Sequence, residues 1–156
     1  MPMVSGSSSS LGSGVAAVSG TYYLQERALT APAALLGLAL GAQAAAVLIV
    51  NNLRDLEADR QAGRRTLAGR LGHRGAVLLY GVLMLAPYPL CALAIQGGTP
   101  GAWSPFWAAL PFSAWLAWRL PLLKDGPAMN RQLALTALAQ VLLGSLLALT
   151  LLLPVD

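Results

Sequence analysis

Asparagine and aspartate recur at every fourth position directly after a long uncharged stretch of the chain. Asn51, Asp55 and Asp59 have this spacing, and residues 31–50 before them carry no charge. If the helix continues past Val50, side chains four residues apart lie on nearly the same face, with Cβ atoms about 5 to 6 Å apart. Carboxylate and amide oxygens are hard ligands that suit Mg²⁺. The spacing therefore predicts a magnesium site in which Asp55 and Asp59 are the catalytic carboxylates and Asn51 is a third ligand.

Arginines surround these three residues. Guanidinium groups form charge-assisted, often bidentate hydrogen bonds with phosphate oxygens. Protein-bound Mg²⁺ usually completes its coordination shell with substrate phosphates and water. We therefore expect a diphosphate group to be held between the metal and four arginine side chains, Arg54, Arg60, Arg64 and Arg65.

A simpler interpretation of the same segment is a solvated helix end with ion pairs, for example Glu57 with Arg60. That interpretation gives no reason for Asp55 and Asp59 to be four residues apart, because like charges at this spacing mildly destabilise a helix. The spacing and the setting favour a metal and diphosphate role slightly over the ion-paired helix end.

Two other residues have side chains that can be reactive, but we expect neither to take part in catalysis. Cys91 is the single cysteine and stands in an apolar stretch, where burial raises a thiol pKa and suppresses nucleophilicity. His73 is the single histidine, which excludes zinc motifs built on histidine pairs. We expect Cys91 to be a packing residue and His73 to be a surface residue.

The composition is that of a membrane protein. Hydrophobic residues make up 56% of the chain and charged residues only 10%, and the mean hydropathy is +0.63. Four apolar stretches are long enough, or nearly so, for the roughly 20 helical residues that cross a bilayer. The fold class expected is an all-α transmembrane bundle with spans at residues 28–50, 76–95, 102–123 and 133–153.

Other segments complete the expected organisation. Residues 1–14 are rich in serine and glycine and predict a flexible segment, whereas residues 15–24 are apolar but too short to span. Residues 15–156 then form one domain with a partial helix at its start. Pro87 and Pro89 fall inside the second span and predict a kink or short break there.

The distribution of Lys and Arg predicts the orientation. These residues crowd the segments at 51–74 and 119–131, while residues 96–101 carry no charge. Because short cytoplasmic loops collect Lys and Arg, we expect a multi-pass protein of the inner (cytoplasmic) membrane with residues 51–74 inside. The net charge of +4 then reflects this asymmetry and contact with anionic lipid, and no nucleic-acid partner is expected.

The charged segment resembles a known motif. Residues 51–60, followed by 62–68 and 70–72, look like the second aspartate-rich motif of the UbiA-type intramembrane aromatic prenyltransferases. Residues 20–25 and 133–153 resemble this family more weakly. Within the family the resemblance is to the branch that prenylates 1,4-dihydroxy-2-naphthoate in menaquinone biosynthesis.

The resemblance implies a helical membrane enzyme with a cavity open toward the cytoplasm. Two aspartate-rich motifs would bind Mg²⁺, which bridges the diphosphate of a polyprenyl diphosphate. The bond between carbon and diphosphate ionises, and the aromatic ring attacks the allylic cation. In this branch dihydroxynaphthoate also loses its carboxylate, leading to demethylmenaquinone. Asp55 and Asp59 match metal-ligand positions, Asn51 matches the first position, and Arg64 and Arg65 match basic positions of the following loop.

The chain departs from the family pattern in one respect. Members of the family have about nine spans and a first aspartate-rich motif near their start, but no Asp precedes Asn51 here. We therefore expect this chain to be an incomplete, C-terminal part of the enzyme that is inactive alone and would need a missing N-terminal half as its partner.

Three alternatives stay open. The acceptor could be another aromatic or quinone precursor used by the same family. A non-catalytic membrane scaffold subunit would explain the hydropathy but not the spacing of Asn51, Asp55 and Asp59. A CDP-alcohol phosphotransferase also places aspartates and Mg²⁺ at a membrane edge, but its Asp-Gly-x-x-Ala-Arg motif is absent from this sequence.

Overall fold

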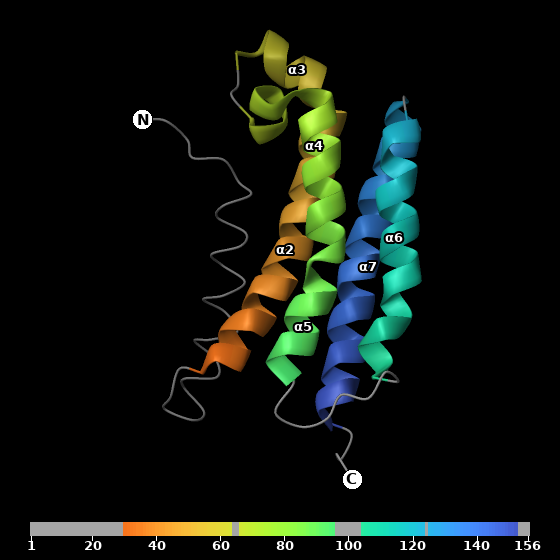
Figure 1. Cartoon of the computed structure of the whole chain (residues 1–156). Coiled ribbons are helices and arrows are strands. Elements are labelled where there is room, and N and C mark those ends of the chain that lie inside the picture. Colours follow the sequence, from red (N-terminus) through yellow and green to blue (C-terminus); the bar gives the residue numbers. More distant parts are fainter. Residues whose placement is uncertain (1–29, 64–65, 96–103, 124, 153–156) are drawn as a thin grey trace.

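The computed structural model describes residues 30–63, 66–95, 104–123 and 125–152, and these ranges contain helices and no strand. The long helices run side by side as a bundle (Figure 1). The expected all-α fold is therefore confirmed. The flexible segment and the partial helix expected before residue 30 lie outside the described residues. In chain order the elements are α2 (Ala31–Arg54), α3 (Leu56–Gln61), α4 (Leu67–Leu85), α5 (Pro87–Ile95), η1 (Pro105–Ala109), α6 (Leu110–Arg119), η2 (Leu120–Leu122) and α7 (Gly126–Leu152).

Hydroxyl side chains cap the two helices that flank the charged segment. The Oγ1 atom of Thr30 accepts a hydrogen bond from the Ala33 amide at 3.4 Å, and Oγ1 of Thr66 accepts one from the Gly69 amide at 3.2 Å. Each cap satisfies a backbone donor that has no partner inside its helix. The capping residues therefore set where α2 and α4 begin.

The break expected at the prolines is present. The α4 helix ends at Leu85 and α5 begins at Pro87. Pro87 has no backbone N–H to donate, but the amides on either side keep their bonds, from Ala86 to the Val82 carbonyl at 2.8 Å and from Leu90 to the Ala86 carbonyl at 3.3 Å. The pair α4 and α5 therefore acts as one interrupted membrane helix.

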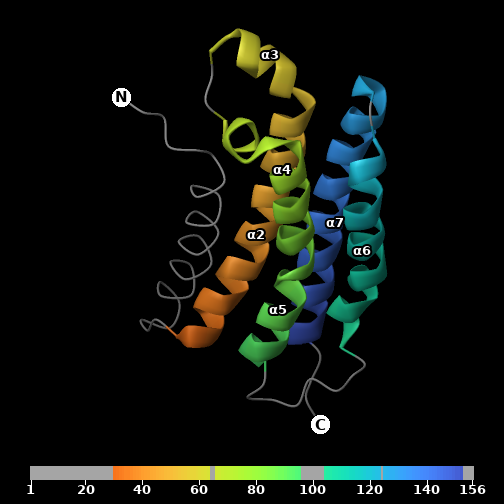
Figure 2. The ribbon, with the colours of Figure 1, turned by 45° about the horizontal axis from the view of Figure 1, so that its top comes forward.

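A second interruption lies within α4. Gly72 has φ 68° and ψ 171°, a combination that is essentially restricted to glycine. Figure 2 shows the first turns of α4 turned away from the axis of the rest of that helix. Gly72 therefore separates the short segment near α3 from the part of α4 that lies in the bundle.

Three helical segments in the described residues are long and apolar enough to cross a membrane, at Ala31–Arg54, Leu67–Ile95 and Gly126–Leu152. They correspond to three of the four expected spans. The fourth, expected at 102–123, is helical from 105 to 122 but consists of the three pieces η1, α6 and η2. Pro105, Pro111 and Pro121 stand in the first turns of these pieces, where each proline removes one backbone donor.

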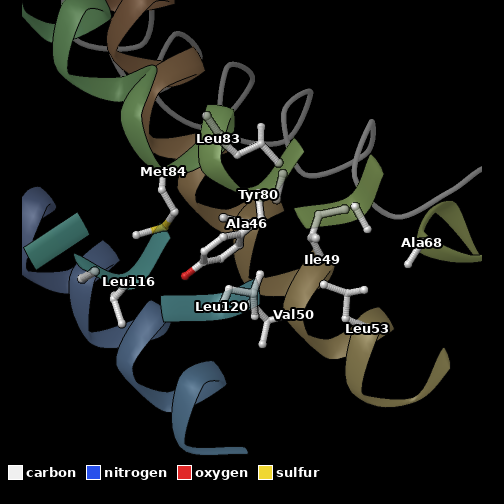
Figure 3. Close-up of a cluster of buried hydrophobic side chains, with 14 of the residues drawn as sticks. Ala46, Ile49, Val50, Leu53, Ala68, Tyr80, Leu83, Met84, Leu116 and Leu120 are labelled. Atoms are coloured by element: carbon white, nitrogen blue, oxygen red, sulfur yellow. The ribbon is translucent and has the colours of Figure 1, made fainter. Parts of the chain in front are cut away.

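The core contains a polar cluster that joins α4, α6 and α7. Tyr80 lies among buried apolar side chains, and its hydroxyl points toward α6 and α7 (Figure 3). That oxygen is 2.8 Å from Oγ1 of Thr136 and accepts a hydrogen bond from Nε2 of Gln132 at 3.2 Å. The same Nε2 donates to the Leu116 carbonyl at 2.9 Å. These bonds fix the three helices relative to one another beneath the charged end of α2.

Candidate functional site

The last turn of α2 brings Asn51 and Arg54 to the end of a membrane-length helix. Asp55 follows directly, with φ −94° and ψ 6°, and it ends α2 and precedes α3. The helix continues past Val50, but it ends at Arg54, because the backbone leaves α-helical geometry at Asp55. The backbone bonds still follow helical spacing, from the Asp55 amide to the Asn51 carbonyl at 3.1 Å and from the Asp59 amide to the Asp55 carbonyl at 2.8 Å.

The Arg54 guanidinium donates hydrogen bonds to three side-chain oxygens at the end of α2. Its Nε donates to Oδ1 of Asp55 at 2.8 Å, and its Nη2 donates to Oδ2 of Asp55 at 2.7 Å. The same Nη2 donates to Oδ1 of Asn51 at 2.8 Å. Three oxygen atoms from two side chains therefore converge on one cation.

The fourth contact of Arg54 reaches another helix. Its Nη1 donates to Oδ1 of Asn130 at 3.1 Å, in an exposed bond that spans 76 positions of sequence. Asn130 lies in the first turns of α7. Arg54 thus connects the charged end of α2 to the start of α7.

The carboxyl group of Asp55 is held ionised. The hydrogen bond from Arg54 lowers the pKa of Asp55, partial burial opposes this effect, and the positive charge of Arg54 lowers the pKa further. A ligand for a hard cation must be deprotonated. Asp55 meets that requirement at neutral pH.

The remaining residues of the expected site lie at different places. Asp59 is in α3 with a buried side chain, one turn beyond Asp55, whereas Arg60 beside it is exposed. Arg64 and Arg65 lie outside the described residues, so their expected role in binding diphosphate stays a prediction. The structure thus brings Asn51, Arg54 and Asp55 into one cluster and places Asp59 on the neighbouring helix.

The chain is similar in sequence to a known enzyme family. Residues 7–146 match the model of the UbiA prenyltransferase family. The chain belongs to the UbiA prenyltransferase family. It is also a membrane protein, as its apolar helices indicate.

Individual relatives of this UbiA-family chain carry one enzyme name. The 1,4-dihydroxy-2-naphthoate octaprenyltransferase of Haemophilus influenzae is 42% identical over 92 residues, which are 58% of this chain and 29% of that protein. The Escherichia coli protein of the same name is 40% identical over 76 residues, or 49% of this chain and 25% of that protein. The chain therefore spans less than a third of the length of these relatives. No solved structure matches it.

Enzymes of this family generally depend on a divalent metal ion, and the cluster at the end of α2 fits part of such a site. Asn51 and Asp55 present hard oxygen atoms that converge on one point, and Mg²⁺ is often bound through only one or two carboxylates with phosphate and water. Within the described residues, no group of three or more His, Cys, Asp or Glu side chains could hold a metal. These residues would therefore supply only part of a coordination shell.

Several features of the site and its surroundings were not expected from the sequence. An ion pair in the charged segment joins Arg54 and Asp55, whereas the example expected from the sequence was Glu57 with Arg60. The spacing of Asn51, Arg54 and Asp55 was a visible signal, because residues three apart are neighbours on a helix. The contact with Asn130 gave no local signal. The two structural interpretations are confirmed, since Cys91 is buried and His73 is exposed.

Proposed function

We propose that this chain forms part of an enzyme that transfers a polyprenyl group from polyprenyl diphosphate to 1,4-dihydroxy-2-naphthoate, with Mg²⁺ as the metal. The observation that carries the proposal is the convergence of the Asn51 and Asp55 oxygens on one cation at the end of a membrane-length helix. Membership of the UbiA prenyltransferase family and the name shared by the relatives support the reaction type and the acceptor.

The residues have distinct parts in this reaction. Asn51, Asp55 and Asp59 would hold the metal, and Arg54, Arg60, Arg64 and Arg65 would bind diphosphate oxygens. When bound, a divalent cation stabilises the negative charge that develops on the departing diphosphate. The arginines stabilise the same charge through hydrogen bonds. The bond between the prenyl carbon and the diphosphate oxygen breaks with its electron pair on oxygen, and the naphthoate ring supplies the electrons for the new carbon–carbon bond. The carboxylate then leaves the ring as CO₂, and the electron pair of its bond to the ring restores the aromatic system.

The setting of the cluster suits a lipid-soluble donor. The cluster lies where a membrane helix ends, so a diphosphate could remain at the water boundary while its prenyl chain stays in the apolar layer. We further propose that residues 51–74 face the cytoplasm and that the membrane is the inner one, because the Lys and Arg residues gather at this end.

The test uses a chimera in which the matched residues of the Haemophilus influenzae relative are replaced by those of this chain. Transfer of a labelled prenyl group to dihydroxynaphthoate is measured in membranes, with Mg²⁺ and with a chelator. Asp55→Asn and Asp59→Asn should each lower the rate by more than about 100-fold, because even residues behind the metal ligands typically contribute 10- to 100-fold.

The matched control is Glu57→Gln in the same segment. Glu57 is exposed, and its carboxylate accepts a hydrogen bond from Gln61 at 3.1 Å, so this variant should retain the parent rate. Equal losses in all three variants, or near-normal rates in both aspartate variants, would contradict the metal role. A single-ring hydroxybenzoate as competing acceptor tests the substrate, since preferential prenylation of that compound would reassign it.

A further inference from the structure

Arg54 uses the oxygen atoms that the proposed metal site requires. Both carboxylate oxygens of Asp55 and the amide oxygen of Asn51 accept hydrogen bonds from its guanidinium at 2.7 to 2.8 Å. A guanidinium and a divalent cation that share these oxygens would be like charges only a few ångströms apart, and they would repel each other. One of the two must move when the other binds.

The hydrogen bond from Arg54 to Asn130 can remain in place while the rest of the guanidinium moves away from Asp55 and Asn51. It uses Nη1, the nitrogen that does not bond to Asp55 or Asn51. This bond is exposed, and the Arg54 side chain retains 29% of its accessible surface. Arg54 can therefore release Asp55 and Asn51 toward water while it keeps its hold on α7.

We propose that Arg54 is a positioning residue that occupies the metal ligands as an internal counter-cation and transfers to the diphosphate when metal and diphosphate bind. The inference rests on the proposed function, because it takes Asn51 and Asp55 to be metal ligands. Without a bound metal, Arg54 orients the three oxygens toward one point. When the diphosphate arrives, its oxygens replace those of Asp55 as acceptors for the guanidinium.

This exchange has a thermodynamic consequence. A metal ion alone must displace Arg54 without giving it a new anionic partner, so the metal alone binds weakly. Metal and diphosphate together supply both a cation for the carboxylate and an anion for the guanidinium. Each ligand therefore raises the affinity for the other, and the site favours the metal–diphosphate complex over a free metal ion.

The experiment measures Mn²⁺ binding to the chimera in which this chain replaces the matched residues of the Haemophilus influenzae relative, in lipid nanodiscs, from the electron paramagnetic resonance signal of the free ion. Arg54→Gln should bind Mn²⁺ roughly 3- to 10-fold more tightly than the parent chain, because one competing positive charge is removed. Arg54→Lys, which keeps the charge but cannot bridge both oxygens of Asp55, should lie between the two. Arg74→Gln is the matched control, since it removes an exposed charge of residues 51–74 that lies outside the proposed site, and it should stay within about twofold of the parent.

Binding of inorganic diphosphate at a fixed Mn²⁺ concentration provides the second measurement. Arg54→Gln should reduce the gain in Mn²⁺ affinity that diphosphate gives to the parent chain. If Arg54→Gln and Arg54→Lys bind Mn²⁺ no more tightly than the parent while Asp55→Asn loses binding, the counter-cation role is wrong and the metal site stands. If Asp55→Asn binds Mn²⁺ as the parent does, or if none of the variants binds it, the proposed metal site itself fails.

Discussion

The hydroxyl oxygens of Tyr80 and Thr136 lie 2.8 Å apart in the interior of the bundle, although 56 positions separate the two residues in the chain. Each residue has a further bond: Tyr80 accepts from Gln132, and the Thr136 hydroxyl donates to the Gln132 carbonyl. The pair connects two membrane helices where water is excluded. Its strength can therefore be measured separately from the chemistry at the end of α2.

Tyr80→Phe should lower the free energy of unfolding by about 1 kcal/mol, because a buried hydrogen bond is lost. In a double-mutant cycle with Thr136→Val, the coupling energy should be about 0.6 kcal/mol, the usual size between membrane helices. Reversible unfolding in mixed detergent micelles measures both values. Ser113, which pairs with Tyr88 rather than Tyr80, gives the control, and a Tyr80 and Ser113 cycle should show almost no coupling. Equal coupling in both cycles would refute a specific pair.

Gly72→Ala should destabilise the chain by about 1 to 3 kcal/mol, because its φ of 68° and ψ of 171° suit only glycine. Apart from Gly72 itself and its neighbours in the chain, no atom of the described residues lies within 4 Å of the position that a Cβ would take, so the cost comes from the backbone alone. Gly81→Ala is the matched control. It lies in the helical part of α4 with the same open space, and it should stabilise by about 0.5 to 1 kcal/mol. Thermal unfolding of both variants checks the opposite signs, and effects of the same sign would contradict the backbone explanation.

Gln43→Met should raise the free energy of unfolding by about 1 to 2 kcal/mol. Gln43 is fully buried in α2, and neither polar atom of its amide has a hydrogen-bond partner among the described residues. An apolar side chain of similar length therefore removes a desolvation cost. Gln132→Met is the control. Gln132 is equally buried, but its Nε2 donates to Tyr80 and to the Leu116 carbonyl, and its replacement should destabilise. A loss of stability in both variants would show that the Gln43 amide has a partner after all.

The orientation can be tested by thiol labelling in a chain whose buried Cys91 is replaced by Ala. Glu57→Cys, at the exposed surface of α3, should react with a membrane-impermeant maleimide only in inside-out vesicles. Gln96→Cys lies outside the described residues, in the segment expected on the other side, and it should react only in right-side-out vesicles. The reverse pattern would overturn the orientation inferred from the Lys and Arg residues.

The sequence allowed the apolar helices and the break before Pro87 to be predicted, because hydropathy and proline act locally. The division of residues 105–122 into three helical pieces also had local signals in Pro105, Pro111 and Pro121. The mean hydropathy of a stretch does not register such prolines, so the stretch was predicted as one continuous span. The interruption of α4 at Gly72 was harder to predict from the sequence. Glycine permits its backbone conformation without requiring it.

The candidate site could be predicted only in part. The spacing of Asn51 and Asp55 indicated a shared cation, and the structure places both against one. That this cation is Arg54 follows from its place beside Asp55 and three residues after Asn51, a spacing that the i to i+4 pattern of the three expected ligands does not include. The bond to Asn130 depends on how α7 packs, and no local pattern specifies a contact across 76 positions.

The backbone around Asp55 should tolerate no insertion or deletion of residues. The backbone bonds from Asn51 to Asp55 and from Asp55 to Asp59 form an unbroken series across Asp55. Inserting or deleting one residue between them would turn every later side chain by about 100° and shift it by about 1.5 Å. A change between Asn51 and Arg54 would separate Asn51 from Arg54 and Asp55, and a change between Asp55 and Asp59 would displace Asp59. Insertions and deletions among natural variants should therefore be excluded from residues 51–59.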